Sequence, residues 1–185
     1  MGPVRRVAAL AVLAAVPVLV LGALGRSAGA PPEPAHVPPY PIPAATARLG
    51  DGTPWRTRTD LGGPVALLYV TEGCPHCRAD LASWASLAST GPPPPLWVVV
   101  APGPETLTWV PPELRARAVV DHQGSVGRSL GVRAVPVTFW VDGEGVVRWH
   151  RMGRSPRTRL LADLGTLAAQ SGPAGSSELR RRRIP

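Results

Sequence analysis

Two runs of apolar, β-forming residues on either side of a helical pattern limit the folds that this chain can adopt. Pro64–Thr71 and Leu96–Ala101 have the length and composition of strands that are buried on both faces of a sheet. Between them, Pro75–Ser89 has apolar residues at helical spacing and ends before Gly91 and the four prolines Pro92–Pro95. Strands that are separated by helices indicate an α/β domain.

Further elements are expected within residues 44–169. Two hairpins are predicted, one from Ala45–Leu49 and Trp55–Thr57 around Gly50-Asp51-Gly52, the other from Pro136–Val141 and Val146–Met152. The other expected elements are a broken helix over Pro104–Arg117, a short strand at Ala118–Asp121 and a helical turn at Ser125–Leu130. Ser155-Pro156 should start a last helix, whose expected apolar side has Leu160, Leu161, Leu164, Leu167 and Ala168. These elements predict one domain with a central mixed sheet flanked by helices.

The first thirty residues resemble an export segment. Arg5 and Arg6 precede the uncharged stretch Val7–Gly25, and Arg26 follows it, so the rest of the chain is expected on the far side of a membrane. The stretch is long enough to span a bilayer, and a small-residue cleavage site at Ala28-Gly29-Ala30 is followed unfavourably by Pro31. We expect residues 1–30 to be an uncleaved signal anchor in the cell membrane, with a cleaved signal peptide and a secreted domain as the alternative.

Low-complexity segments flank the predicted domain. Seven of the thirteen residues in Pro31–Pro43 are proline, which predicts an extended linker between the anchor and the domain. Residues 170–185 are polar and end with Arg180–Arg183, which is typical of a disordered basic tail.

The net charge of +8 is concentrated outside the domain. Residues 44–169 have thirteen Arg against ten acidic residues, and the rest of the excess lies in the two ends. A nucleic-acid-binding protein should have its basic patch on the folded part, so we expect no nucleic-acid partner. A monomer is expected.

Both cysteines of the chain lie in the motif Cys74-Pro75-His76-Cys77, between the first buried strand and the first long helix. Cys74 would face the unpaired N–H groups of the helix N-terminus, which stabilise a thiolate, and Pro75 is tolerated in a first helical turn. Cys77 would lie one turn inside the helix as a buried resolving thiol, and His76 could add a positive charge beside Cys74. The motif therefore predicts a redox-active pair.

Two other interpretations of the motif remain open. The cysteines could be half of a zinc site that His76, His122 or His150 completes, although the chain has no second cysteine pair. They could also form a purely structural disulfide, which would stabilise the fold little because the loop that it closes is so short.

Around this motif, the segments GPVALLYVTEGCPHCRADLASWASLAS and VVDHQGSVGRSLGVRAVPVTFWVDGEGVVRWHRMG resemble thioredoxin-fold thiol:disulfide oxidoreductases. The similarity is greatest to the membrane-anchored, extracytoplasmic TlpA/ResA-like branch and covers about residues 44–169. The resemblance implies a thioredoxin-like fold with an N-terminal hairpin and activity without a cofactor. It also implies a cis peptide bond at Pro136 beside the cysteines, with the main chain of Val135 binding an extended protein substrate.

The sequence departs from that branch at three places. Gly73 replaces the tryptophan that usually precedes the first cysteine, and Leu68 occupies the position of the buried aspartate of thioredoxins. The Pro-His dipeptide, with Val135 before the proline, is more similar to DsbA-type oxidants. We therefore expect oxidation or exchange of disulfides in exported proteins, with an unidentified redox partner. A reductant of the cytochrome-c-maturation type is the alternative.

Two rival classes are also considered. Thr71, three residues before Cys74, is similar to part of the peroxiredoxin pattern, but Leu67 stands where that pattern has proline. A copper chaperone would use Cys74, Cys77 and His150. We expect His122 and His36 to be solvated, and Trp140 and Trp149 to be core or site-lining residues without an assigned role.

Overall fold

The structure is a computed structural model that describes residues 39–103 and 107–170. Strands and helices alternate through most of the chain, as the hydrophobic runs predict. In chain order the elements are β1 (Tyr40–Pro41), β2 (Thr46–Leu49), β3 (Pro54–Arg56), β4 (Val65–Val70), α2 (Pro75–Thr90), β5 (Leu96–Val100), α3 (Pro112–Arg115), β6 (Ala118–Val120), α4 (Ser125–Ser129), β7 (Val137–Val141), β8 (Val146–Met152) and α5 (Arg157–Gln170).

Within the described residues, the strands form a single mixed sheet in the order β1-β8-β7-β4-β5-β6-β2-β3. The central strands β4, β5 and β6 are parallel, whereas β7 is antiparallel to β4. Both predicted hairpins are present, as β2–β3 and β7–β8. All six residues of β4 are buried, because β4 lies in the middle of the sheet and helices cover both of its faces.

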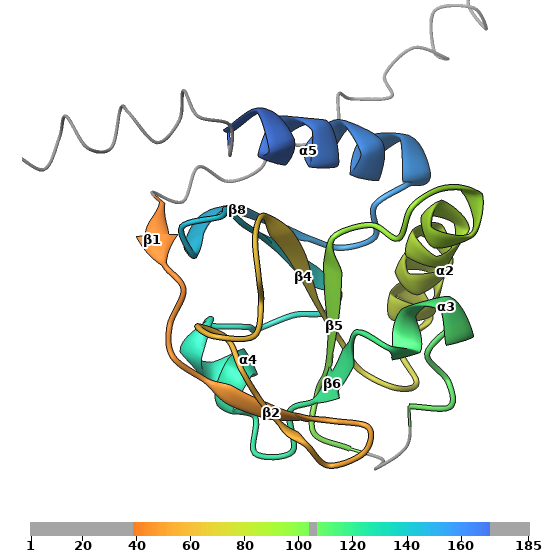
Figure 1. Cartoon of the computed structure of the whole chain (residues 1–185). Helices are drawn as coiled ribbons and strands as arrows, with labels where there is room; N and C mark the ends of the chain where they lie inside the picture. Colours follow the sequence, from red (N-terminus) through yellow and green to blue (C-terminus); the bar gives the residue numbers. More distant parts are fainter. Residues whose placement is uncertain (1–38, 104–106, 171–185) are drawn as a thin grey trace, which may run out of the picture. The chain divides into compact units, whose positions relative to one another are not determined.

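Helices cover the two faces of the sheet, with α2, α3 and α5 on one face and α4 on the other (Figure 1). Alternate residues of β4 belong to the two cores that result, since successive strand side chains point to opposite faces. The core under α2 and α5 includes Leu68, Cys77, Leu81, Trp84, Trp140, Leu160 and Leu167. The core under α4 includes Trp55, Leu67, Tyr69, Val126, Leu130 and Phe139.

A buried carboxylate holds α4 against the sheet. Asp121 Oδ2 accepts hydrogen bonds from Tyr69 Oη at 3.1 Å and from the main-chain N–H of Gly127 at 2.9 Å. A Cβ atom at Gly127 would lie 2.5 Å from Tyr69 Oη, so this close approach requires glycine. The Asp121 carboxylate therefore has a structural role, joining α4 to β4.

Three sequence predictions are corrected by the structure. In the described part of Pro104–Arg117, only Pro112–Arg115 is helical, because Pro111-Pro112 interrupt the pattern. The domain begins before residue 44, since Tyr40 and Pro41 pair with β8 and Ile42 is 3% exposed. In α5, Leu161 and Ala168 are exposed, and Asp163 lies on the buried side because Arg151 and Arg159 neutralise it.

The predicted signal anchor, most of the predicted linker and the predicted basic tail lie outside the described residues. Among the helices that the structure describes, none has both the length and the apolar character needed to cross a membrane. The candidate export stretch Val7–Gly25 lies outside the described residues.

Candidate active site

Three chain segments meet at one end of the sheet. The carboxyl end of β4 leads into Cys74, and the pairing of Tyr69 with Val137 places the start of β7 at the same end. The end of β8 also lies there, because Gly153 donates its main-chain N–H to the carbonyl of Pro136 at 2.8 Å. We call these segments, Thr71–Arg78, Gly131–Pro136 and Met152–Pro156, the cysteine end of the sheet.

Cys74 is the N-cap residue of α2. Its Sγ accepts a hydrogen bond from the main-chain N–H of Cys77 at 3.2 Å, and its own backbone is extended, with φ −79° and ψ 114°. Pro75 follows in the first turn, as predicted, where its missing N–H costs no hydrogen bond. Because Cys74 is the N-cap, its sulfur lies at the positive end of the helix dipole. Cys74 is only half-buried, so it can still be reached from solvent.

Cys77 lies one turn further along α2 and is completely buried. Burial, together with a hydrogen bond to Cys74 and the charges of Cys74 and Asp80, raises the pKa of Cys77 to about 12. A main-chain hydrogen bond from Thr71 acts in the opposite direction. Both cysteines are free thiols in the structure. Cys77 is therefore protonated at neutral pH and must lose a proton before it can act as a nucleophile.

The Val135–Pro136 peptide bond is cis, as the family resemblance implies. Pro136 is buried, and Val135 is half-buried against both hydrophobic cores. Among the residues that the structure describes, none makes a main-chain hydrogen bond with Val135. Because unpaired main-chain groups need a partner or water, Val135 can accept an added extended segment at the cysteine end.

Asp80 is a site residue that the sequence analysis missed. It is completely buried on the same side of α2 as Cys77 and Leu81, and its Oδ1 accepts a hydrogen bond from the main-chain N–H of Ser155 at 2.9 Å. Its Oδ2 has no hydrogen-bond partner among the described residues. Burial raises the pKa of Asp80 to about 6, against the lowering effects of the Ser155 hydrogen bond and the charge of Arg154.

A sequence signal for Asp80 existed, because residues three apart lie on the same face of a helix and Asp80 follows Cys77 by three. Leu68, at the position where thioredoxins have their buried aspartate, packs in the same core as Cys77. The carboxyl group near Cys77 is therefore on the helix rather than on the strand.

Replacing Asp80 by asparagine should flatten the pH dependence of stability. Asp80 has a higher pKa in the folded state, about 6, than its ordinary value of 3.8, so the folded state binds this proton more tightly. Its contribution to stability is complete below the ordinary value and is lost as the pH rises through the folded value. The loss amounts to about 3 kcal/mol, from the energy of one pKa unit. Asparagine keeps an Oδ1 acceptor for Ser155 but does not ionise.

Urea unfolding of both proteins at a series of pH values tests this prediction. Between the ordinary pKa of 3.8 and the folded pKa of about 6, the free energy of unfolding of the wild type should fall relative to that of Asp80→Asn as the pH rises. Other carboxyl groups titrate in both proteins, so the difference between them isolates Asp80. Two curves that stay parallel would show that Asp80 is not held in this environment.

The other predicted residues of the motif are on the surface. Pro75 and His76 are exposed at the start of α2. Gly73 adopts a positive φ of 80°, and no atom lies within 4 Å of the position that a Cβ would occupy there. There is consequently free space at Gly73, where related proteins are expected to have tryptophan.

Of the histidines considered as metal ligands, His76 lies within the motif, whereas His122 and His150 do not lie with the cysteines. The ring of His150 packs against Phe139 at 5.6 Å between ring centroids, in contact with the α4-side core, whereas Cys77 belongs to the core on the opposite face. His122 is exposed, as expected, beyond the end of β6. No group of three or more potential ligands among the described residues is placed to hold a metal ion.

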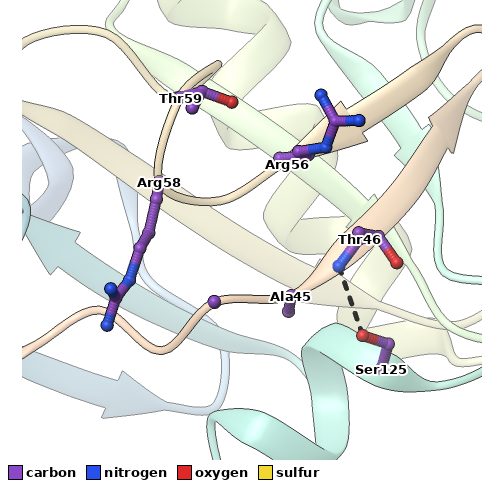
Figure 2. A pocket seen from close by; sticks show the side chains of 7 residues that line it. Ala45, Thr46, Arg56, Arg58, Thr59 and Ser125 are labelled. Carbon is purple, nitrogen blue, oxygen red and sulfur yellow. Dashed lines mark hydrogen bonds between the residues drawn. The ribbon is translucent and has the colours of Figure 1, made fainter.

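A pocket of about 240 Å³ lies at the far edge of the sheet, between the β2–β3 region and α4. Thr46 donates its main-chain N–H to Ser125 Oγ at 3.2 Å across it. Figure 2 shows the side chains of Arg56 and Arg58 pointing away from each other, so they do not converge on one ligand. Neither cysteine lines this pocket, and we assign no function to it.

A buried thiol behind a half-buried N-cap cysteine, beside a cis proline on this sheet, defines a thioredoxin-fold thiol:disulfide oxidoreductase. A solved relative in fold is the thio-disulfide isomerase of Thermus thermophilus, which is 24% identical with a TM-score of 0.57, the match covering 71% of this chain and 96% of that one. The chain belongs to the DsbE family of thiol:disulfide interchange proteins.

Two curated members illustrate the relationship. The DsbE protein of Pseudomonas fluorescens biotype C is 30% identical over 138 residues, which cover 65% of this chain and 72% of that protein. The DsbE protein of Escherichia coli strain K12 is 30% identical over 95 residues, 50% of this chain and 51% of that protein. The chain spans only 18% to 52% of the length of other curated relatives that it matches. It matches no protein-family model.

Proposed function

We propose that the chain exchanges disulfides with protein substrates through Cys74 and Cys77, with Val135 and the cis proline Pro136 positioning the substrate. The observation that carries this proposal is the difference between the two sulfurs. Cys74 is half-buried at a helix N-terminus, whereas Cys77 is buried and has a raised pKa. One thiol can meet a protein substrate, and the other can react only with its neighbour.

In the oxidising direction, a substrate thiolate attacks Cys74 Sγ of the Cys74–Cys77 disulfide. The bond between the two cysteines breaks, a mixed disulfide forms with Cys74, and Cys77 leaves as a thiolate that takes up a proton. A second substrate thiolate then attacks the substrate sulfur of the mixed disulfide and releases Cys74. Two electrons pass from the two substrate thiols to the cysteine pair, and the substrate leaves with a disulfide.

Asp80 serves as the proton-handling group for Cys77 in this proposal. Its charge reaches Cys77, and its raised pKa of about 6 lies near neutrality. A carboxyl group with such a pKa can give a proton to the leaving Cys77 thiolate and can take it back in the reverse reaction. His76, exposed beside Cys74, contributes positive charge near the reactive thiol when it is protonated.

We further propose that the domain works as a monomer outside the cytoplasm, tethered by Val7–Gly25 and spaced from the membrane by Pro31–Pro38. The arginines before the apolar stretch support this orientation. Disulfides persist in such compartments, so oxidised substrates and a redox partner would be present there. The Pro-His dipeptide between the cysteines favours the oxidising direction over the reducing one.

Equilibration of the purified protein with glutathione redox buffers tests the proposal. We expect a Cys74–Cys77 disulfide to form reversibly, with a reduction potential above about −250 mV, towards the oxidising end of the range for thioredoxin-fold proteins. A reversible disulfide with a lower potential would retain exchange but make the chain a reductant. Failure to form the disulfide would refute the exchange function itself.

The rival functions have less support in the geometry. In a copper site His150 would have to lie with the cysteines, but it contacts the core on the other face of the sheet. The peroxidase interpretation rests on Thr71 alone, because Leu67 stands where the peroxiredoxin pattern has proline.

A further inference from the structure

Three exposed arginines lie on the segments of the cysteine end, and among the described residues none of them has a carboxylate partner. Arg78 follows Cys74 by four residues, so the two lie on the same face of α2, and Arg78 donates its main-chain N–H to the Cys74 carbonyl at 3.1 Å. Arg133 precedes Val135 by two residues, and Arg154 follows Gly153, which pairs with Pro136. All three side chains are exposed.

Arginines elsewhere in the domain are used differently. Arg148 is paired with Asp142 and Glu144, and Arg151 and Arg159 are paired with Asp163. Among the described residues, by contrast, the side chains of Arg78, Arg133 and Arg154 form no ion pair and no hydrogen bond. The charge of Arg154 acts on the buried Asp80, whose pKa it lowers.

Acidic side chains, which could neutralise these arginines, are scarce at the cysteine end. Its three segments contain these three arginines, His76 and a single acidic residue, Glu72. Asp121, beyond the end of β6, is buried and holds Tyr69 and Gly127. The three segments of the cysteine end thus have a net positive charge, although the folded part as a whole has only a small positive excess.

From this placement we propose that the site selects protein segments in which acidic side chains flank the reacting cysteine. The proposal deepens the exchange function above and rests on it. A segment lying along Val135 with its sulfur at Cys74 would have Arg133 two residues from Val135 and Arg78 one helical turn after Cys74, so Asp or Glu side chains on either side of its cysteine would meet a guanidinium. Complementary charge accelerates encounter and orients the bound segment.

The chemistry of the selected step is a balanced exchange. In the Cys77→Ser variant, the Cys74 thiolate attacks the peptide sulfur of a mixed disulfide between a peptide cysteine and thionitrobenzoate. A Cys74–peptide disulfide forms, the original disulfide breaks, and the coloured thionitrobenzoate anion leaves with the electron pair. No outside oxidant or reductant is required.

The experiment compares three such peptides of equal length, in which Glu, Gln or Lys flanks the cysteine. At about 0.01 M salt we expect the Glu peptide to release thionitrobenzoate about tenfold faster than the Lys peptide, with the Gln peptide between them. At about 0.5 M salt the difference should largely disappear, because exposed charges are then screened. Rates are read from absorbance under conditions of excess peptide.

Two sets of variants in the Cys77→Ser background locate the effect. The combined change Arg78→Gln and Arg133→Gln should reduce the preference for the Glu peptide to about twofold or less. Arg154 is kept because it also acts on Asp80. The matched control is Arg117→Gln, which removes an exposed arginine before β6, at the opposite end of the sheet, and should leave the preference unchanged.

The outcomes separate this inference from the function on which it rests. If the Gln peptide reacts but the Glu and Lys peptides react equally fast, the acidic preference is wrong and the exchange function stands. A preference that survives loss of Arg78 and Arg133, or that Arg117→Gln abolishes, also refutes it. If none of the peptides forms a disulfide with Cys74, the exchange function itself fails.

Discussion

Replacing Cys74 by serine is expected to lower the rate of thiol–disulfide exchange by about a thousandfold or more, to that of the uncatalysed reaction. Cys74 has the only sulfur of the motif that is reachable from solvent, since Cys77 is completely buried. A serine hydroxyl cannot form a disulfide, and Cys77 cannot meet a protein substrate in its place. The measurement is the rate of disulfide exchange with a peptide whose reacting cysteine is flanked by uncharged residues.

Serine at position 74 should leave the fold intact. Cys74 accepts the capping hydrogen bond from the main-chain N–H of Cys77, and serine is among the preferred N-cap residues of helices. The free energy of unfolding of Cys74→Ser is therefore expected to stay within about 0.5 kcal/mol of that of the reduced wild type.

Cys77→Ser is the matched comparison, because it removes the second sulfur and keeps the first. We expect this variant to form a mixed disulfide with substrate and to retain it, since no resolving thiol remains. Accumulation of that species by mass measurement, with none in the Cys74→Ser variant, identifies Cys74 as the attacking thiol. Mixed disulfides with Cys77 alone would reverse the assigned roles.

Replacing Trp140 by alanine should have the largest effect on stability, a loss of about 3–5 kcal/mol in the free energy of unfolding. Trp140 is 0% exposed in β7, and its ring lies 5.9 Å from that of Trp84 in α2 and 5.6 Å from that of Trp149 in β8. The indole nitrogens of Trp84 and Trp140 have no hydrogen-bond partner among the described residues. The contribution of Trp140 therefore comes from packing, and alanine would leave a cavity between α2 and the sheet.

Urea unfolding followed by circular dichroism measures this loss without depending on tryptophan fluorescence. Leu161→Ala is the control, because Leu161 is an apolar residue of α5 that is 51% exposed, and its replacement should change stability by about 0.5 kcal/mol or less. A loss below about 1 kcal/mol for Trp140→Ala would show that the three rings do not form a packed core.

Local patterns in the sequence determined much of the fold and the central pair of the site. The two buried runs became β4 and β5, and the helical pattern between them became α2, because hydrophobic period and turn residues act over a few neighbours. The position of Cys74 and Cys77 at the strand-to-helix junction is likewise local, and the structure places them there as predicted. The cis bond before Pro136 followed from family resemblance alone.

Long-range contacts decided what those patterns left open. Leu161, which was expected on the apolar side of α5, is exposed, whereas Asp163 is buried where the Arg151 side chain of β8 pairs with it. Likewise, Asp80 gains its role from burial beside Cys77 and from the main-chain N–H of Ser155, 75 residues away. The sequence by itself thus determined the reactive cysteine pair, but not the carboxyl group beside it. Only the tertiary structure decided their protonation and their neighbours, because burial and charge depend on segments that the fold brings together.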